Sequence, residues 1–502
     1  MRDLPEFADL RDFLAWCEGQ GNLATISEPV PLAHAMTAVH RKVLEQGGPV
    51  LRFTQPIDGA GRRLKMPVVS NLFGTPERVC AGLGVTLEKL DDLGAFLAAL
   101  RAPQPPENAR DALSCWPMLK AALATRPKVI KRADVQSVCL EDDDVDLARI
   151  PVQTHWPGDA GPLITWPVVL TRPFGTDAAD MHRYNAGVYR AQVIERDRLI
   201  MRWLEHRGGA AHMRSWHKSG EPMPVAIALG ADPATLLSAA LPLPETVSEI
   251  TFAGALAGRR PRMTPARTVP MMVPANAEIV VEGWVYPDDV APEGPFGDHT
   301  GYYNSVEPFP VMRVTAITTR KDPIYLSTYT GRPPDEPSAI GEVFNQLSLP
   351  VIRAQIPEIR DLWLPPAACS YRMAVISIDK RYPGQARRVM MGLWGMLPQF
   401  SYTKMIVVVD DDIDPRNWDD IAWAMATRMD PARDVMVLDR TPMDYLDFAA
   451  PEAGLAGKIG IDATNKIGSE TMREWGNVMK TAPEDAAFAT DLVARCLPEL
   501  GR

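Results

Sequence analysis

Two carboxylates that could share a proton, Glu293 and Asp298, lie in one loop with Gly294, Pro295 and Gly297. Carboxylates that are forced close together repel each other, so the pKa of one of them rises and that group keeps a proton near neutral pH. Such a carboxyl can act as a general acid. Spacing alone favours a simpler alternative, a surface turn in which both acids are solvated.

Three further residues, Asn185, His206 and Glu249, would supply an amide oxygen, an imidazole and a carboxylate. This mixed set suits a divalent ion such as Mn²⁺ or Mg²⁺. The three residues are far apart in the sequence, so their spacing carries almost no specificity. A histidine flanked by Glu205 and Arg207 is more often a surface residue than a ligand.

Arg190, Arg202 and Arg207 gather in one stretch that ends in Gly208-Gly209. Arginines combined with exposed backbone amides can bind a phosphate group. Without other information, the alternative that these are solvent-facing strand positions is favoured.

The sequence lacks the motifs of several common enzyme classes. It has neither a P-loop nor a Gly-x-Gly-x-x-Gly after a strand, and neither Gly-x-Ser-x-Gly nor His-Glu-x-x-His. Its six cysteines include no Cys-x-x-Cys pair, which argues against a zinc ribbon and against a disulfide scaffold.

Composition indicates an ordinary globular protein rather than a nucleic-acid-binding or membrane-spanning one. The formal net charge is −10, no long run of Lys or Arg is present, and the basic segment Arg126–Arg132 is short and interrupted by apolar residues. Binding to a phosphate backbone requires a basic surface, so no nucleic-acid partner is expected. The first residues lack the apolar segment of a secretory signal, and apolar runs are too short to cross a bilayer. We therefore expect a cytoplasmic protein.

The elements that must position these residues fall into three regions. A chain of 502 residues is too long for one core. Residues 1–130 contain helical spacing at Leu10–Cys17 and a helix start at Thr75-Pro76, which indicate an α/β domain. Residues 131–330 are β-rich. In residues 331–502, strands alternate with helices, which predicts a parallel sheet in a C-terminal α/β domain. The fold class is therefore α+β with several domains.

Two of the candidate strands in the β-rich region pass through candidate site residues. The six predicted strands are Leu163–Leu170, Val188–Ile194, Leu199–Leu204, Val225–Gly230, Glu278–Val285 and Pro310–Thr318.

Longer motifs along the chain resemble the UbiD family of non-oxidative decarboxylases. They extend from about residue 9 to about residue 476, which is nearly the whole chain. The main ones are Asn71–Thr75, Val188–Arg190, Met201–Gly209, Leu229–Thr235, Ala291–Asn304, Ser327–Pro337, Arg388–Gly392, Thr427–Asp434 and Asp462–Lys466.

The resemblance implies a prenylated FMN cofactor in a β-rich, split-barrel-like domain, a divalent ion that is usually Mn²⁺, and often K⁺. Asn185, Glu249 and His206 match the metal-binding positions of the family. Its cofactor contacts fall on Val188, Tyr189, Arg190, Arg202, Trp203, Leu204, Arg207 and Gly208. Asn185 and Arg190 would face opposite sides of a regular strand, so we expect a bulge at Gly187.

The catalytic positions of the family fall on Arg190, Glu293 and Asp298. The proton donor would be Asp298, with Glu293 as its partner acid and Arg190 holding the substrate carboxylate. Many relatives carry glutamate at position 298, so the acid is one methylene shorter in this chain.

The implied reaction is decarboxylation of 4-hydroxy-3-polyprenylbenzoate to 2-polyprenylphenol in ubiquinone biosynthesis. An alternative keeps the fold and cofactor with another aromatic or acrylic acid, such as a vanillate- or protocatechuate-type compound. A second alternative is a non-catalytic flavin- or metal-binding assembly factor, against which the intact acids and Arg190 argue. The resemblance further implies a flavin prenyltransferase as cofactor supplier and a homodimer or homohexamer. A polyprenylated substrate would be compatible with a peripheral contact at the inner membrane.

Overall fold

The computed structural model describes the whole chain except residues 1, 102–115, 206, 245, 397 and 498–502. In the N-terminal region, helix α1 (Leu10–Gly19) begins after Asp9, whose side chain accepts a hydrogen bond from the Asp12 amide. Its buried residues are Leu10, Phe13, Leu14 and Cys17, as the helical spacing predicted. Helix α3 (Pro76–Leu83) begins after Thr75, also as predicted.

The N-terminal helices surround a small sheet of four strands in the order β1-β3-β5-β18. The last strand comes from the end of the β-rich region, so the two regions share hydrogen bonds. The strands are β1 (Leu23–Ile26), β3 (Val50–Phe53), β5 (Val68–Ser70) and β18 (Tyr325–Leu326), and the other elements here are α2 (Ala35–Leu44), α4 (Leu90–Arg101), β2 (Val30–Pro31) and β4 (Pro56–Ile57).

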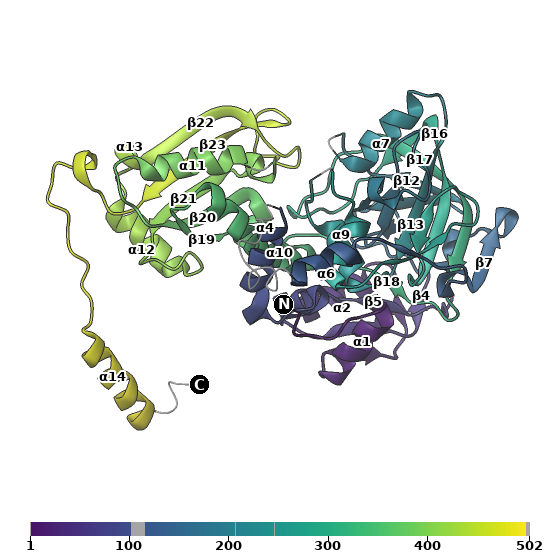
Figure 1. The fold of residues 1–502 in the computed structure, drawn as a ribbon, viewed down its shortest axis with the longest axis horizontal. Coiled ribbons are helices and arrows are strands. Elements are labelled where there is room, and N and C mark those ends of the chain that lie inside the picture. The colour runs from purple at the N-terminus through teal and green to yellow at the C-terminus, as the bar shows by residue number, and fades with distance from the viewer. Residues whose placement is uncertain (1, 102–115, 206, 245, 397, 498–502) are drawn as a thin grey trace.

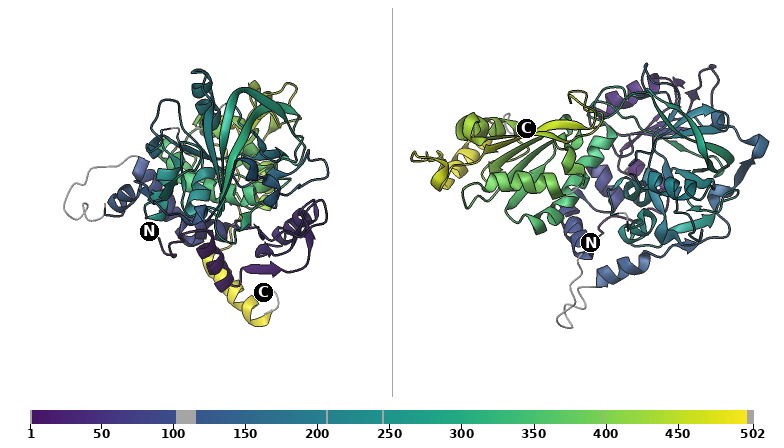
Figure 2. Two further views of the ribbon diagram at one scale, coloured as in Figure 1. Left: turned by 90° about the vertical axis from the view of Figure 1, so that its right-hand side faces the viewer. Right: turned by 90° about the horizontal axis from the view of Figure 1, so that it is seen from above.

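A nine-stranded, predominantly antiparallel sheet forms the centre of the molecule and curls into a half-barrel, as its turned views show (Figure 2). This confirms the predicted β-rich domain. Its longest pair is the hairpin of β16 (Ile279–Glu293) and β17 (Glu307–Thr319), which ends at Glu293. The remaining strands are β7 (Val138–Glu141), β8 (Leu163–Ile164), β9 (Val168–Thr171), β10 (Asn185–Val188), β11 (Ala191–Glu195), β12 (Arg198–Met201) and β13 (Met223–Leu229).

The strand predicted over Val188–Ile194 is wrong, because the chain leaves one strand and enters another at Tyr189-Arg190. Strand β10 pairs with β9, whereas β11 pairs with β8 and β12. The bulge expected at Gly187 is also wrong, since this glycine pairs regularly with Val169. The alternation of side chains along a strand does not extend across such a break. The direction of the Arg190 side chain is therefore set by the break between β10 and β11, and not by strand alternation.

Helices pack against both faces of this central sheet, α8 and α9 on one face and α7 on the other, and α8 also contacts α3 of the N-terminal region. Helix α9 begins at Glu249 and helix α7 at Gly208, so two candidate site residues lie at helix N-termini. The elements are α6 (Trp116–Ala124), α7 (Gly208–His217), α8 (Pro233–Ala240) and α9 (Glu249–Ala257), with a small sheet of β6 (Lys128–Val129), β14 (Arg262–Pro265) and β15 (Met272–Pro274).

The C-terminal region is a second α/β unit that lies beside the half-barrel, joined to it by the long helix α10 (Glu336–Gln355) (Figure 1). Its sheet has the order β19-β20-β21-β23-β22. The three central strands are parallel, as predicted, and both edge strands are antiparallel. Its elements are β19 (Ile359–Trp363), β20 (Met373–Ile378), β21 (Met405–Asp410), β22 (Val435–Pro442), β23 (Leu455–Ala463), α11 (Gln385–Met396), α12 (Trp418–Arg428) and α13 (Pro431–Asp434).

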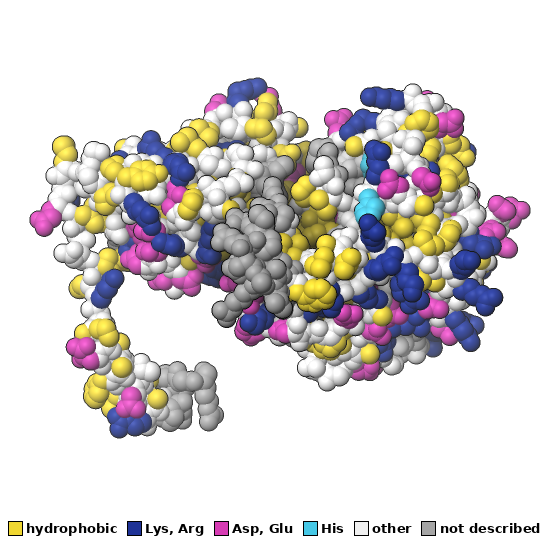
Figure 3. Space-filling view, viewed as in Figure 1, with side chains coloured by type: hydrophobic (Ala, Val, Ile, Leu, Met, Phe, Trp, Pro, Cys, Tyr) yellow, Lys and Arg dark blue, Asp and Glu magenta, His cyan; other side chains and the backbone are white. Residues whose placement is uncertain are grey.

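The last helix, α14 (Pro483–Cys496), stands away from the rest of the chain, and none of its residues is buried (Figure 1). Across the part of the chain that the structure describes, no helix is long and apolar enough to span a membrane. On the face shown in Figure 3, basic and acidic side chains are interspersed.

Candidate active site

Arg190 lies between the two acids that the sequence singled out, and it binds both of them. Its Nε is 2.9 Å from Glu293 Oε1 and its Nη1 is 2.9 Å from Asp298 Oδ2. Its Nη2 donates to Asn304 Oδ1 at 2.9 Å. The Glu293 side chain is completely buried. The two acids are therefore joined through a guanidinium and are not a solvated turn.

The arginine changes the protonation expected for Asp298. Burial alone would raise the pKa of this carboxyl. Hydrogen bonds from His299 and the positive charges of Arg190 and His299 outweigh burial, so the pKa of Asp298 is lowered. In this arrangement Asp298 is a carboxylate. The expected repulsion between the two acids therefore does not raise the pKa of Asp298, because Arg190 and His299 supply positive charge beside it.

A second arginine, Arg202, supports Glu293 from the other side. Its Nη1 donates to Glu293 Oε2, and its Nη2 donates to the hydroxyl of Tyr445 at 2.6 Å. The guanidinium also lies 4.9 Å from the ring centre of Phe309. Because Tyr445 follows β22, the C-terminal region reaches the acid cluster directly.

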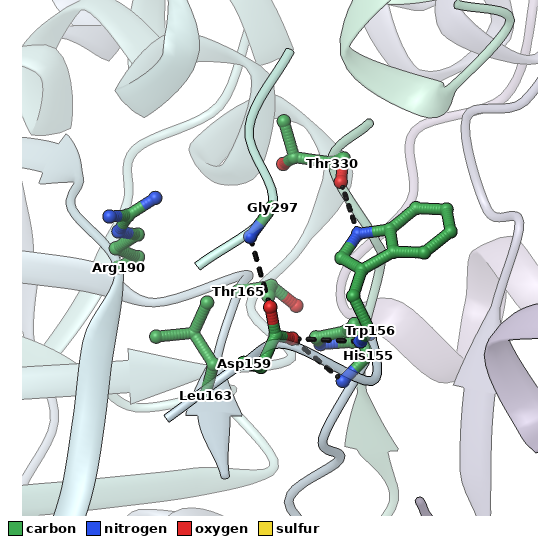
Figure 4. A pocket seen from close by; sticks show the side chains of 8 residues that line it. All are labelled: His155, Trp156, Asp159, Leu163, Thr165, Arg190, Gly297 and Thr330. Atoms are coloured by element: carbon green, nitrogen blue, oxygen red, sulfur yellow. Dashed lines mark hydrogen bonds between the residues drawn. The ribbon is translucent and has the colours of Figure 1, made fainter. Parts of the chain in front are cut away.

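A small pocket opens beside the acid cluster, with Arg190 and Leu163 on one side and Trp156 and Thr330 on the other (Figure 4). Asp159 closes its floor by accepting hydrogen bonds from the backbone amides of Gly297 at 2.9 Å and Trp156 at 2.8 Å. The remaining lining residues are His155 and Thr165.

Glycine is required at position 297 because a Cβ there would lie 2.3 Å from Trp156 Cδ1. This close approach lets the loop that carries Asp298 pack onto the wall of the pocket. Asp298 is therefore held next to the small pocket that Arg190 and Gly297 line.

Two of the three candidate metal ligands come together at the start of α9. Glu249 Oε2 accepts a hydrogen bond from the Ala186 amide at 2.8 Å, which places the carboxylate next to Asn185. Burial raises the pKa of Glu249 to about 7, so a cation would be needed to keep it ionised. Asn185 Nδ2 and Ser248 Oγ are buried without a partner among the described residues. The third candidate, His206, lies outside the described residues.

Asn185 and Glu249 thus fit a divalent ion by the chemistry of their oxygens. Among the described residues, no group of three or more His, Cys, Asp or Glu side chains forms a metal site.

The N-terminus of helix α7 lies beside this pair. A Cβ at Gly208 would come within 2.1 Å of Asn185 Oδ1, so only glycine allows the helix to approach so closely. Arg207 precedes the helix and Trp203 Nε1 is buried with no partner in the described part of the chain. A helix N-terminus that follows an arginine suits a phosphate group.

The other candidate cofactor contacts are Tyr189, Val188, Leu204 and Arg202. Tyr189 donates from its hydroxyl to Asn185 Oδ1 at 3.3 Å, and Val188 ends β10 beside it. Leu204 packs against the apolar side chains of Ile200, Phe309 and Val311. Arg202 instead holds Glu293, so its cofactor contact stays a prediction.

Several residues that build the site were not singled out by the sequence. Asn304 binds Arg190, and its place at the end of the Ala291–Asn304 motif was a usable signal. Asp159 and Tyr445 carried no signal, because each lies in a segment without any other candidate residue and reaches the site only through the fold.

Comparison with known families gives three matches in chain order. They are the N-terminal domain of 3-octaprenyl-4-hydroxybenzoate carboxy-lyase (UbiD) over residues 14–97, its Rift-related domain over residues 128–333, and its C-terminal domain over residues 338–463.

Solved structures with the same fold cover nearly the whole chain. One is the UbiD-class enzyme HmfF from Pelotomaculum thermopropionicum in complex with FMN, with 28% identity over 96% of this chain and 99% of that chain and a TM-score of 0.78. Another is vanillic acid decarboxylase from Sedimentibacter hydroxybenzoicus in its closed form, with 24% identity over 98% of this chain and 99% of that chain and a TM-score of 0.81. A third is the 3,4-dihydroxybenzoic acid decarboxylase from Enterobacter cloacae, with 23% identity over 97% of this chain and 100% of that chain and a TM-score of 0.76.

Proposed function

The chain belongs to the UbiD family of carboxy-lyases, and on this basis we propose that it decarboxylates 4-hydroxy-3-polyprenylbenzoate to 2-polyprenylphenol with prenylated FMN. The observation that carries the proposal is the placement of Arg190. Its guanidinium borders the pocket and is shared between Glu293 and Asp298. A cation that can bind a carboxylate thus lies next to an acid that can deliver a proton.

The residues around Asn185 are suited to hold the cofactor. Asn185 and Glu249 would bind a divalent ion such as Mn²⁺, and the N-terminus of α7 with Arg207 would bind the flavin phosphate beside it. When bound, the prenylated flavin supplies the electron sink for the charge left on carbon. HmfF, the relative with the same fold, has been solved with FMN and with prenylated FMN, which supports this assignment.

Arg190 would bind the carboxylate of the substrate through a charge-assisted pair of hydrogen bonds. Its Nη1 is engaged by Asp298 in the structure, so the substrate would compete with Asp298 for this donor. When Asp298 loses the arginine, its pKa rises and it accepts a proton more easily. Glu293, which is bound to Nε of Arg190, keeps the guanidinium in place throughout.

Breaking the carbon–carbon bond releases CO₂ and leaves the electron pair on the ring carbon. Asp298 would then transfer one proton to that carbon and return to a carboxylate. The net reaction consumes one proton per molecule of substrate, and this proton must reach Asp298 from solvent.

A second substrate class has a specific observation in its favour. Two structures with the same fold are decarboxylases of vanillic acid and of 3,4-dihydroxybenzoic acid. The competing proposal is therefore a vanillate- or protocatechuate-type decarboxylase with the same cofactor and the same roles for Arg190 and Asp298.

The test is CO₂ release by the flavin-loaded chain with each acid in turn. We expect turnover of the polyprenylated acid and little turnover of vanillate or protocatechuate. The reverse order would replace the proposed substrate by the smaller phenolic acids. Absence of CO₂ release from every acid, with the prenylated flavin bound, would favour a non-catalytic flavin-binding role.

The acid is tested separately by Asp298→Asn, which keeps the size of the side chain but cannot deliver a proton. We expect decarboxylation to fall by about 10²- to 10⁴-fold while flavin content stays unchanged. The matched control is Asp439→Asn, an exposed aspartate on β22 that should retain full activity. Near-normal activity of Asp298→Asn would exclude it as the proton donor.

Three expectations about partners accompany the proposed function. A flavin prenyltransferase would supply the cofactor, and K⁺ would bind near the flavin phosphate. The chain would assemble as a homodimer or homohexamer. A peripheral contact with the inner membrane would give a polyprenylated substrate access to the site.

A further inference from the structure

His299 lies directly behind Asp298, at the point where the half-barrel meets the C-terminal region. Its Nδ1 is 2.9 Å from Asp298 Oδ1, and its backbone amide donates to the same oxygen at 2.8 Å. On the other side of the ring, Nε2 is 3.7 Å from Asp444 Oδ2. This nitrogen is buried and has no hydrogen-bond partner among the described residues. The imidazole thus stands between two carboxylates from different domains.

The far carboxylate is held firmly by the C-terminal region. The Tyr371 hydroxyl donates to Asp444 Oδ2 at 2.7 Å, and Arg372 Nη2 lies 3.3 Å from the same oxygen. Burial raises the pKa of Tyr371 well above its ordinary value, so this hydroxyl keeps its proton and acts as a donor. Asp444 is therefore a fixed negative charge facing His299.

The next residue along the same segment supports the other acid. Tyr445 accepts a hydrogen bond from Arg202, and Arg202 binds Glu293. Two adjacent residues of the C-terminal region therefore reach the two acids separately, Asp444 through His299 and Tyr445 through Arg202. This division of contacts indicates that the two acids have different tasks.

The reaction requires a proton that Asp298 does not hold in this arrangement. Each turnover removes one proton from Asp298, and the bound arginine favours its carboxylate form. A neighbouring group must therefore resupply the proton once per cycle. His299 is in hydrogen-bond contact with Asp298, and its side chain is 20% exposed, which gives it access to solvent.

Building on the proposed function, we infer that His299 is the proton source for Asp298, and that Asp444 of the C-terminal region keeps His299 charged for this task. The imidazolium transfers the proton on Nδ1 to Asp298 Oδ1, which becomes a neutral carboxyl and then protonates the ring carbon. The neutral imidazole keeps its proton on Nε2 and regains one on Nδ1 from water, which restores the imidazolium. One proton enters from solvent and one is consumed, so the cycle balances.

The electrostatics of the ring agree with this role. Burial alone would lower the pKa of His299, but the hydrogen bond to Asp298 and the charges of Asp298 and Asp444 raise it above the ordinary value. The positive charge of Arg372 acts in the opposite direction. Asp335 is a further acidic group near the ring, and the positive charge of His299 acts to lower the pKa of its carboxyl.

The first test follows the His299 ring itself in the full chain without cofactor. Its NMR titration is identified by the signal missing in His299→Asn. In Asp444→Asn, the titration midpoint should fall by about one pH unit, because the negative charge that stabilises the imidazolium is removed. In Tyr371→Phe, the midpoint should rise, because Asp444 loses a hydrogen-bond donor. An unchanged midpoint in both variants would overturn the role of Asp444.

The second test measures kcat of the flavin-loaded enzyme against pH, with whichever acid it turns over. The wild-type rate should decline as pH rises through the pKa of His299, because only the imidazolium can donate. Asp444→Asn should move this decline to lower pH. His299→Asn keeps a donor toward Asp298 but carries no titrating proton, so kcat should fall about 10²-fold and the decline should disappear.

The control is His182→Asn, an exposed histidine whose replacement should leave the profile unchanged. A role of His299 in orienting Asp298 alone predicts that His299→Asn retains kcat and the pH profile, and that result would overturn the inference. Failure of the proposed function is distinguishable, because then the wild type itself releases no CO₂ from any acid.

Discussion

Two buried clusters of titratable groups in this chain treat their carboxylates in opposite ways. In the acid cluster, Glu293 and Asp298 are bound by Arg190, and the pKa of Asp298 is lowered. In the second cluster, where α10 packs on the N-terminal region, the equally buried Glu336 has His40 Nε2 at 3.5 Å as its ion-pair partner. Burial raises the pKa of Glu336 to about 7 and lowers that of His40 to about 3.

The difference shows that burial does not decide where a proton resides. Glu293 and Glu336 are both fully buried, but only Glu293 is in direct contact with guanidinium groups, those of Arg190 and Arg202. A raised carboxyl pKa is often used as a sign of a catalytic acid. Here the raised group, Glu336, accepts a hydrogen bond from the Phe73 amide and serves the packing of α10 on the N-terminal region, whereas the pocket lies beside the ionised pair.

The largest effect is expected from Arg190→Met, which removes the guanidinium that binds both Glu293 and Asp298. Glu293 would then keep only Arg202 and Asp298 only His299, so each acid would lose one of its two positive partners. We expect a loss of kcat of at least about 10³-fold, and a loss of stability of about 3 kcal/mol because a buried ion pair is broken. Chemical denaturation and CO₂ release measure the two effects.

The control is the double variant Arg190→Met with Asp298→Asn, which removes one acid together with the guanidinium and leaves the pair of Arg202 and Glu293 intact. Most of the stability should return while activity stays lost. If the double variant is as unstable as the single one, the loss of stability does not come from a buried charge without a partner.

The other side of the contrast is tested by Glu336→Gln. Burial raises the pKa of Glu336 from its ordinary value of 4.5, which applies to the unfolded chain, to about 7 in the folded state. Its stabilising contribution is therefore complete below pH 4.5 and is lost as pH rises through about 7. Glutamine carries no charge that must be buried, so the variant should be roughly 3 kcal/mol more stable than the wild type at pH 8 and equally stable at pH 4.

Stability against denaturant at both pH values measures this gain. The exposed Glu28→Gln should show no such dependence on pH. A wild-type advantage at pH 8 would mean that Glu336 is ionised and paired in the folded protein, and the contrast between the clusters would fail.

The smallest effect is expected from Tyr445→Phe, which removes one hydrogen bond from the outer side of the acid cluster. Arg202 keeps its contact with Glu293, so stability should fall by about 1 kcal/mol. Thermal unfolding measures the change, and the exposed Tyr382→Phe is the control. A loss as large as that of Arg190→Met would show that the C-terminal contact, rather than Arg190, holds the cluster together.

Much of the architecture was readable from local patterns. The helix at Leu10–Gly19 followed from its apolar spacing, and the β-rich centre followed from its strand-forming residues. The prediction failed at Tyr189-Arg190, because a pattern of alternating side chains does not reveal that a chain changes its pairing partner. That break is what aims Arg190 at the acids.

The sequence by itself determined the chemical inventory of this protein: the acids, the arginines, the glycines that permit close approach and the resemblance of their motifs to the UbiD family. Only the tertiary structure decided their protonation and their partners. Arg190 is 103 residues from Glu293 in the chain and Arg202 is 243 residues from Tyr445, yet each pair is in contact. A pKa depends on charges and burial in space, and these are set when distant segments pack together.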